Sequence, residues 1–284
     1  MTIKAGVMGW PVDHSRSPAL HGFWLKTYGI DGTYERLPVK PEDLAAALRA
    51  LPEKGFAGVN LTVPHKEAAM SVVDEISPEA KRIGAVNTIF VAADGRLKAT
   101  NTDAYGFITS LKTSAPQFDA KSGPAVVLGA GGAARAVCVA LQDAGVPEVC
   151  IINRTTARAD TLARDLGGKL TVAAWSERST RLKTASLLVN TTTQGMQGQS
   201  PLELDLETLS PRATVTDIVY TPLETPLLAA ARARGNIVVD GLGMLLYQAQ
   251  LGFESWFGRR PEVTQALRDH VLGNKAPESK VRAD

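Results

Sequence analysis

The chain has 284 residues and a formal net charge of +2; hydrophobic residues make up 44% of it and charged residues 21%. This length suffices for about two domains with a core each, and the composition is typical of a globular protein. The small net charge gives no indication of a nucleic-acid or anionic-membrane partner. No apolar run approaches the ~20 residues of a membrane-spanning helix, and the first residues lack the apolar core of a signal peptide, so we expect a cytoplasmic protein.

Taken in chain order, the first third of the sequence predicts short strands and helices. Ser17 and Pro18 are typical of an N-cap and a first helical position, and Asp94-Gly95 is typical of a hairpin turn between two strands. The expected strands are 3–9, 34–39, 58–63, 85–91 and 97–100, and the expected helices are 19–28, 41–51, 65–73 and 103–113.

The rest of the chain alternates more regularly. Strands are expected at 125–128, 149–152, 187–190, 214–219 and 237–239, with helical stretches between several of them. Such alternation predicts a parallel sheet with helices on both faces. Thr225 and Pro226 are typical of the start of a helix, which Gly235 would end. Two closing helices are expected at 244–257 and 261–271, and the charged segment 274–284 is expected to be a loose end.

The two cysteines give no sign of metal or redox chemistry. Cys138 falls inside the helix predicted after residue 132, and Cys150 falls inside the strand at 149–152. Their spacing matches neither a CxxC pair nor a metal site, and each resembles a small buried apolar residue. We therefore expect no bound metal.

The glycine-rich stretch after the strand at 125–128 is the central motif. The sequence GAGGAA at 129–134 joins a buried-type strand to an alanine-rich helix, which is the order of a dinucleotide-binding turn. In such a unit Gly129 permits the turn, Gly131 lets backbone N–H groups approach a pyrophosphate, and Ala134 lets the helix lie close to the strand. The helix N-terminus favours the phosphate charge. An ordinary strand-to-helix turn is the alternative, since such turns also favour glycine.

The residues after the next strand bear on the choice of dinucleotide. An Asp or Glu about 20 residues after the glycines suits the free 2′-hydroxyl of NAD, whereas an arginine suits the 2′-phosphate of NADP. This chain has Asn153, Arg154 and Thr155 there, with Arg158 four residues after Arg154. We therefore expect NADP(H). The alternative is that both arginines are solvated charges at a helix start.

Three features of the remaining chain are candidates for substrate chemistry. Ser15 and Ser17, near the start of a helix, form a site for a carboxylate; capping alone is the alternative. Lys66 lies in a predicted first helical turn, where the helix dipole disfavours an ammonium, and a residue against its local preference is a functional candidate. An ordinary exposed lysine is the alternative there. Gln248 is a polar residue beside the apolar stripe of a closing helix and is expected to face the site.

Several separated stretches together resemble the shikimate dehydrogenases. The likeness covers nearly the full length, and no single stretch would suffice. It rests on HSRSP (14–18), GVNLTVPHK (58–66), GAVNT (84–88), NTDAYG (101–106), GAGGAARA (129–136), NRT (153–155), NTTTQGM (190–196), DIVYTPLETPLL (217–228) and GLGMLLYQA (241–249).

This resemblance implies an α/β protein that reduces 3-dehydroshikimate to shikimate with NADPH. It implies a substrate domain of residues 1–104 plus 242–284, completed by C-terminal helices, and a Rossmann-type domain of residues 105–241 with a parallel sheet. The implied catalytic pair is Lys66 and Asp103. The implied substrate residues are Ser15, Ser17, Thr62, Asn87, Gln248 and Tyr220, and the implied cofactor residues are Gly129, Ala130, Gly131, Gly132, Ala133, Asn153, Arg154, Thr155, Arg158, Thr192, Ile218 and Gly241.

The chemistry is consistent with these residue types. Hydride that reaches a carbonyl carbon leaves charge on the oxygen, which requires a cation or proton donor within hydrogen-bond reach, and a lysine supplies both. Relatives that act on quinate or aminoshikimate, or that prefer NAD, remain alternatives, because one or two polar groups distinguish them. A dinucleotide-sensing module without turnover is an alternative of another class. The partner expected is a small molecule, and the chain is expected to be a monomer or homodimer.

Overall fold

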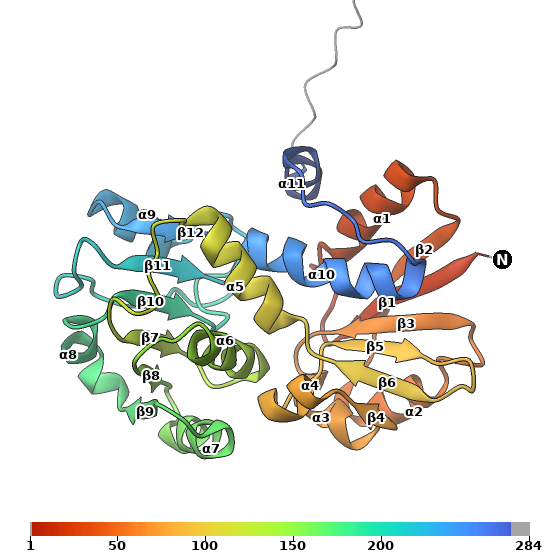
Figure 1. Cartoon of the computed structure of the whole chain (residues 1–284), viewed down its shortest axis with the longest axis horizontal. Coiled ribbons are helices and arrows are strands. Elements are labelled where there is room, and N and C mark those ends of the chain that lie inside the picture. Colours follow the sequence, from red (N-terminus) through yellow and green to blue (C-terminus); the bar gives the residue numbers. More distant parts are fainter. Residues whose placement is uncertain (1, 274–284) are drawn as a thin grey trace, which may run out of the picture.

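The computed structural model describes residues 2–273, so the expected loose end at 274–284 lies outside the described residues. Two six-stranded sheets stand next to each other along the long axis of the molecule, with helices α5 (Asp103–Ser114) and α10 (Gly241–Phe257) between them (Figure 1). No helix of residues 2–273 has the length and apolar character that a membrane crossing requires.

The first sheet is mixed and contains the N-terminal residues. Its strand order is β2-β1-β3-β5-β6-β4, and β5 is antiparallel to both of its neighbours. The hairpin expected at Asp94-Gly95 is confirmed between β5 and β6. The strands are β1 (Ile3–Gly9), β2 (Gly32–Pro38), β3 (Phe56–Leu61), β4 (Glu75–Ile76), β5 (Thr88–Val91) and β6 (Leu97–Thr100), and the helices are α1 (Ser17–Tyr28), η1 (Pro41–Asp43), α2 (Leu44–Arg49), α3 (His65–Ala68), η2 (Ala69–Ser71) and α4 (Pro78–Ile83).

The second sheet is parallel throughout, as the alternating pattern predicts. Its order, β9-β8-β7-β10-β11-β12, is the 3-2-1-4-5-6 order of dinucleotide-binding folds. The strands are β7 (Ala125–Leu128), β8 (Val149–Ile152), β9 (Leu170–Ala173), β10 (Leu187–Asn190), β11 (Thr214–Asp217) and β12 (Ile237–Val239), and the helices are α6 (Gly132–Asp143), α7 (Thr156–Leu166), η3 (Trp175–Glu177), α8 (Arg178–Leu182) and α9 (Pro226–Ala233).

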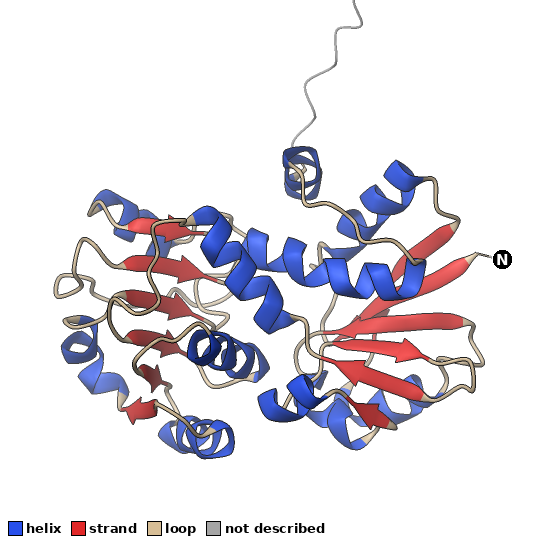
Figure 2. Cartoon of the chain, viewed as in Figure 1, coloured by secondary structure: helices blue, strands red, loops and turns tan. Residues whose placement is uncertain are grey.

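Both faces of the second sheet are covered by helices (Figure 2). Successive side chains of a strand point to opposite faces, and β7 shows this directly. Val127 joins an apolar cluster with residues of α5 and α6, whereas Val126 and Leu128 join a second cluster with residues of α8 and α9. This double coverage is the reason why all four residues of β7 are buried and why the strand is a continuous apolar run.

The C-terminal helices complete the core of the first sheet. Phe253 and Leu246 of α10 and Val271 of α11 (Gln265–Leu272) belong to one buried cluster with Trp24 of α1 and Val7 of β1. The chain therefore returns to its first sheet after it has built the second, and the expected two-domain α/β architecture is confirmed.

Some predicted boundaries are wrong, and the reasons are local. Ser17 is the first residue of α1 and not its N-cap; Arg16 precedes the helix in αR conformation, and no side chain caps the helix start. The helix expected at 65–73 is one α-turn followed by one 3-10 turn. The strand expected from residue 85 begins at Thr88, and the short strands β4 and β9 were not predicted. Helix α10 begins at Gly241, because the Asp240 side chain accepts a hydrogen bond from the Leu242 amide.

Helices α5 and α10 approach each other closely. A Cβ added at Gly106 of α5 would lie 2.6 Å from the Gln248 Cβ and 2.7 Å from the Met244 carbonyl oxygen. A Cβ at Gly243 of α10 would lie 2.2 Å from the Ser110 hydroxyl oxygen. Glycine at both positions therefore sets the spacing of the two helices, and this spacing places Gln248 near the start of α5.

Candidate active site

Lys66 and Asp103 form a buried ion pair where the two sheets meet. Lys66 lies in α3, just after the end of β3, and Asp103 is the first residue of α5. Lys66 Nζ lies 2.5 Å from Asp103 Oδ2, and the two side chains are only 16% and 6% exposed. The α5 N-terminus favours the negative charge of Asp103. The two residues that the sequence indicates as a catalytic pair are thus in direct contact.

A buried hydrogen-bond network surrounds this ion pair. Asn87 donates through Nδ2 to Asp103 Oδ1 at 2.8 Å, to Thr102 Oγ1 at 3.0 Å and to Gln248 Oε1 at 3.3 Å. Its Oδ1 accepts the Thr102 amide at 2.8 Å and the Thr88 hydroxyl at 3.0 Å. Gln248 thus contacts Asn87, which also contacts Asp103. The name active-site network is used from here on for eight residues: Lys66, Asp103, Asn87, Thr102, Thr88, Gln248, Tyr34 and Asn60.

Tyr34 and Asn60 extend the active-site network toward Ser17. The Tyr34 hydroxyl donates to Asn60 Oδ1 at 2.6 Å, and Asn60 Nδ2 donates to the Thr88 hydroxyl at 3.0 Å. Burial raises the pKa of Tyr34, and a hydrogen bond with the Ser17 side chain opposes that rise. Ser17, the first residue of α1, therefore lies beside the Tyr34 hydroxyl.

The remaining predicted substrate residues lie at two nearby loops. The Ser17 amide donates to the Ser15 hydroxyl at 3.3 Å, and Thr62 directly follows β3 with its amide bonded to Met8 of β1. Tyr220 comes from the other sheet, in the loop after β11. Burial raises the pKa of its hydroxyl, and a hydrogen bond with the backbone of Arg16 opposes that rise. Tyr220 thus connects the second sheet to residues 15–17, which we call the serine loop.

The glycine turn lies directly beside Lys66. A Cβ added at Gly132 would lie 3.2 Å from the Lys66 Cβ and 3.6 Å from the Ala85 Cβ. Gly129 has φ +112°, which favours glycine, and a Cβ there would lie 2.6 Å from the Thr191 hydroxyl oxygen and 3.2 Å from Thr192 Cγ2. The structure therefore brings the predicted cofactor turn against the predicted catalytic pair.

The predicted cofactor residues lie at the carboxyl ends of the parallel strands. Helix α6 begins at Gly132 without a side-chain cap or an acidic residue in its first turn, so its amides are open to an anion. Nothing lies within 4 Å of a Cβ added at Gly131, whereas a Cβ added at Gly241 would clash with the Ile218 carbonyl. Arg154 and Arg158 are both exposed, at the end of β8 and in the first turn of α7.

The other cofactor candidates lie in the same turns. Ala130 and Ala133 belong to the segment between β7 and α6. The Asn153 side chain donates to the Thr155 carbonyl at 2.9 Å and so closes the turn before α7. These groups present backbone amides and two exposed guanidinium groups, a donor set that fits a dinucleotide phosphate.

Sequence reasoning missed Tyr34 and Asn60. Asn60 stands inside the apolar strand β3 and is only 5% exposed; a polar amide within a buried run requires partners, and this signal could have identified it. Tyr34 carries no comparable signal, because aromatic residues are common in strands. Its role depends on contacts that only the fold provides.

The cysteines are both free and buried, as expected. Burial raises the pKa of the Cys138 thiol to about 12, so it is protonated at neutral pH.

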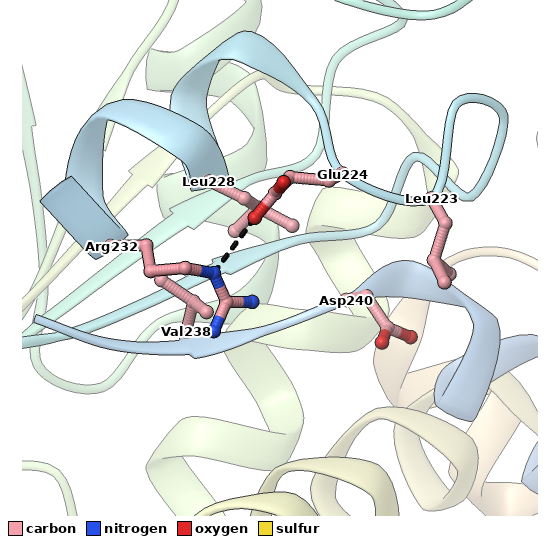
Figure 3. A pocket seen from close by; sticks show the side chains of 6 residues that line it. All are labelled: Leu223, Glu224, Leu228, Arg232, Val238 and Asp240. Atoms are coloured by element: carbon pink, nitrogen blue, oxygen red, sulfur yellow. Dashed lines mark hydrogen bonds and ion pairs between the residues drawn. The ribbon is translucent and has the colours of Figure 1, made fainter.

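A separate hollow of about 360 Å³ lies at the edge of the second sheet, between α9 and β12 (Figure 3). The Glu224–Arg232 ion pair at 2.7 Å crosses it. It includes none of the predicted site residues; it is lined by Leu223, Glu224, Leu228, Arg232, Val238 and Asp240.

The fold and the site together define a two-domain dinucleotide-dependent dehydrogenase. Family models match residues 7–89 (shikimate dehydrogenase substrate-binding domain), 112–197 (shikimate/quinate 5-dehydrogenase) and 241–272 (shikimate 5′-dehydrogenase C-terminal domain). A shikimate dehydrogenase (NADP(+)) of Paramagnetospirillum magneticum is 61% identical over 268 residues, which are 94% of this chain and 97% of that relative. The chain belongs to the shikimate dehydrogenase family.

Solved structures show the same architecture. A shikimate 5-dehydrogenase of Thermus thermophilus in complex with NADP(H) and shikimate is 41% identical, with a TM-score of 0.85 over 96% of this chain and 99% of that one. A quinate dehydrogenase of Corynebacterium glutamicum in complex with NAD is 33% identical, with a TM-score of 0.88 over 96% and 99%. Backbone similarity therefore does not distinguish the two substrates, and the side chains of the site must do so.

Proposed function

We propose that Lys66 and Asp103 are the catalytic pair of an NADP-dependent shikimate dehydrogenase. Family membership gives the reaction, the reduction of 3-dehydroshikimate to shikimate in the shikimate pathway. The observation that carries the assignment of roles is one juxtaposition: the 2.5 Å contact of Lys66 Nζ with Asp103 Oδ2, directly beside Gly132 of the dinucleotide turn.

In this proposal Lys66 is the general acid of the reduction and the general base of the reverse reaction. The cofactor supplies the hydride. As the hydride reaches the carbonyl carbon, negative charge grows on the oxygen, and Lys66 Nζ donates a proton to it. In the reverse direction, the same nitrogen accepts the proton of the substrate hydroxyl. Asp103 holds the lysine by the 2.5 Å contact, and Asn87 fixes the other carboxylate oxygen of Asp103.

The substrate residues are proposed to hold the ring around this pair. The hydroxyls of Ser15 and Ser17 bind the carboxylate, and Thr62, Asn87 and Gln248 bind ring hydroxyls. Support comes from the active-site network, in which Asn87 donates to Gln248, and Tyr34 contacts both Asn60 and Ser17. Pre-bonded donors of this kind lose little freedom on binding. Tyr220 belongs to the same end as the two serines.

The cofactor residues are proposed to bind NADP through backbone and cations. The open N-terminus of α6 with residues 129–133 suits the pyrophosphate, and the exposed Arg154 and Arg158 suit the 2′-phosphate. Asn153 and Thr155 shape that turn. On the other side of the turn, Thr192, Ile218 and Gly241 are proposed to contact the cofactor. NADP dependence itself follows from the family.

Four broader expectations remain proposals. The domain limits, 1–104 plus 242–284 and 105–241, fall in the first turns of α5 and α10, the two helices that lie between the sheets (Figure 1). A monomer or homodimer and a cytoplasmic location remain predictions from the sequence, as does the absence of a metal.

One experiment tests the proposed function. Reduction of NADP⁺ is followed by nicotinamide absorbance with shikimate and quinate in parallel, and each series is repeated with NAD⁺. We expect the highest kcat/KM for shikimate with NADP⁺. A higher value for quinate would assign the chain to the quinate branch of the family. No reduction with any combination would favour a sensing module.

A further inference from the structure

The Arg36 cation is hydrogen-bonded to the backbone of the serine loop. Arg36 of β2 donates through Nη2 to the Ser15 carbonyl oxygen at 2.8 Å. Arg36 and Tyr34 are two residues apart on the strand and therefore point to the same face. Tyr34 reaches the Ser17 side chain, so one face of β2 supports both serines.

Arg36 has no acidic partner among the residues that the structure describes. The ion pairs found among residues 2–273 leave its guanidinium without a carboxylate within 4.0 Å. Its only side-chain hydrogen bond in this part of the chain goes to a neutral carbonyl. Arg16 shows the same pattern, since it donates to the Val271 carbonyl at 3.0 Å. Two positive charges therefore stand uncompensated at this loop.

The charges of Arg16 and Arg36 both act on Tyr220. The cations of Arg16 and Arg36 are near enough to its hydroxyl to oppose the rise in the Tyr220 pKa that burial causes. Residues from β2, from the start of α1 and from the loop after β11 thus meet at residues 15–17. The nearest hydroxyls at this place, Ser15 and Ser17, carry no charge of their own to balance an anion.

We propose that Arg36 is a specificity-determining residue for the carboxylate of the substrate. This inference rests on the proposed function and adds to it the source of charge recognition. The Arg36 cation attracts an anionic ring acid to the serine loop, and its hydrogen bond to Ser15 keeps the loop in the binding arrangement. Because Arg36 is exposed, water and salt screen this attraction, and its effect is moderate.

The test compares an acid with its neutral ester. Initial rates of NADP⁺ reduction are measured for shikimate and for methyl shikimate with wild type, Arg36→Gln and Arg36→Lys. For Arg36→Gln we expect kcat/KM for shikimate to fall about fivefold, mainly through KM, and the value for the ester to change less than about twofold. Arg36→Lys keeps the charge and is expected to retain most of the activity.

Arg96→Gln is the matched control. It removes one exposed positive charge from the same sheet, at the hairpin between β5 and β6, at the opposite end of β5 from Asn87. We expect unchanged kinetics with both substrates. Thermal melting of every variant verifies the fold, and KM for NADP⁺ is expected to stay constant.

A salt series gives a second readout that does not depend on turnover of the ester. For wild type, kcat/KM with shikimate is expected to fall as salt rises from about 20 mM to about 300 mM, and Arg36→Gln is expected to flatten this dependence. Equal losses for acid and ester, or an unchanged salt dependence in Arg36→Gln, would overturn the inference. Absence of any shikimate oxidation by wild type would instead overturn the proposed function.

Discussion

The side chains on the proposed substrate side hydrogen-bond with one another, whereas the arginines on the proposed cofactor side are exposed to solvent. The Asp103 carboxylate contacts Lys66 at 2.5 Å and Asn87 at 2.8 Å, and all three side chains are largely buried. Arg154 and Arg158, which we assign to the cofactor, are exposed, and their side chains make no hydrogen bond to another part of residues 2–273. The turn at 129–132 consists of three glycines and Ala130, so it presents mainly backbone atoms.

This difference follows from what each side must do. A proton transfer requires atoms held within a few tenths of an ångström, so its side chains are fixed by neighbours before the substrate arrives. A dinucleotide is large and charged, and many modest contacts from amides and guanidinium groups suffice to bind it. Substitutions of Lys66, Asp103 or Asn87 should therefore act mainly on kcat, and those on the cofactor side mainly on KM.

Lys66→Ala should produce the largest effect. It removes the proposed proton donor and leaves Asp103 as a buried carboxylate without its cation. We expect kcat to fall roughly 10²-fold or more, with a smaller change in KM. Steady-state NADP⁺ reduction with shikimate measures this, and Lys81→Ala, at an exposed position of α4, is the control. Near-wild-type turnover would remove Lys66 from the mechanism.

Acid should lower the free energy of unfolding, because His21 of the substrate side becomes protonated. This side chain is fully buried against Tyr34, with ring centroids 3.9 Å apart, and burial lowers its pKa from 6.5 to about 3. The unfolded chain then binds more protons between these values, so the stability is fully present above pH 6.5 and is lost as pH falls toward 3. At pH 4 the loss is about 3 kcal/mol.

Urea unfolding at pH 7 and pH 4 measures this loss. His21→Phe keeps an aromatic ring on Tyr34 but cannot be protonated, so its free energy of unfolding should depend less on pH than that of wild type. His270→Gln changes an exposed histidine and should leave the wild-type dependence intact. The same pH dependence in wild type and His21→Phe would show that His21 is not the titrating group.

Gly106→Ala should disturb the helix pair that carries Gln248. The new Cβ would lie 2.7 Å from the Met244 carbonyl oxygen and 2.8 Å from the Gln248 amide nitrogen. Because these are backbone atoms, the helices must separate, at a cost of about 2 kcal/mol. Denaturant unfolding and kcat/KM for shikimate both report it.

Gly22→Ala in α1 is the control for Gly106→Ala. Nothing lies within 4 Å of a Cβ added there, so the higher helix propensity of alanine should stabilise the chain by about 1 kcal/mol. If Gly106→Ala were equally stabilising, close helix contact would not be the reason for that glycine.

Arg154→Ala should have the smallest effect, confined to the cofactor side. Loss of a charged contact with the 2′-phosphate should raise KM for NADP⁺ about tenfold, while KM for NAD⁺ changes little. Arg164→Ala, at an exposed position later in α7, controls for the loss of one charge. Equal increases for both cofactors would mean that Arg154 does not recognise the 2′-phosphate.

Local patterns predicted the second sheet better than the first. Its strands β7, β8, β10 and β12 have the predicted limits, because a strand buried on both faces is a continuous apolar run bounded by polar or glycine residues. The first sheet is mixed, and its two-residue strand β4 depends on pairing with β6, which no local pattern encodes.

The candidate site was predictable where a residue type stands out in the sequence. Lys66, Asp103 and the glycines carry motifs, and Gln248 interrupts an apolar stripe. Tyr34 has no such signal, since its position depends on α1, β2 and β3 coming together. Asn60 carries a detectable signal, an amide inside a buried strand. Contacts between distant elements are therefore the part that required the structure.

The central claim, that Lys66 and Asp103 act as one unit, is tested most directly by a double-mutant cycle on kcat. Lys66→Ala, Asp103→Ala and the double variant are compared with wild type at saturating shikimate and NADP⁺. Groups that work as a unit give strongly non-additive losses, so we expect the double variant to be no more than about threefold slower than the slower single variant. A double variant whose loss equals the product of the two single losses would contradict the account.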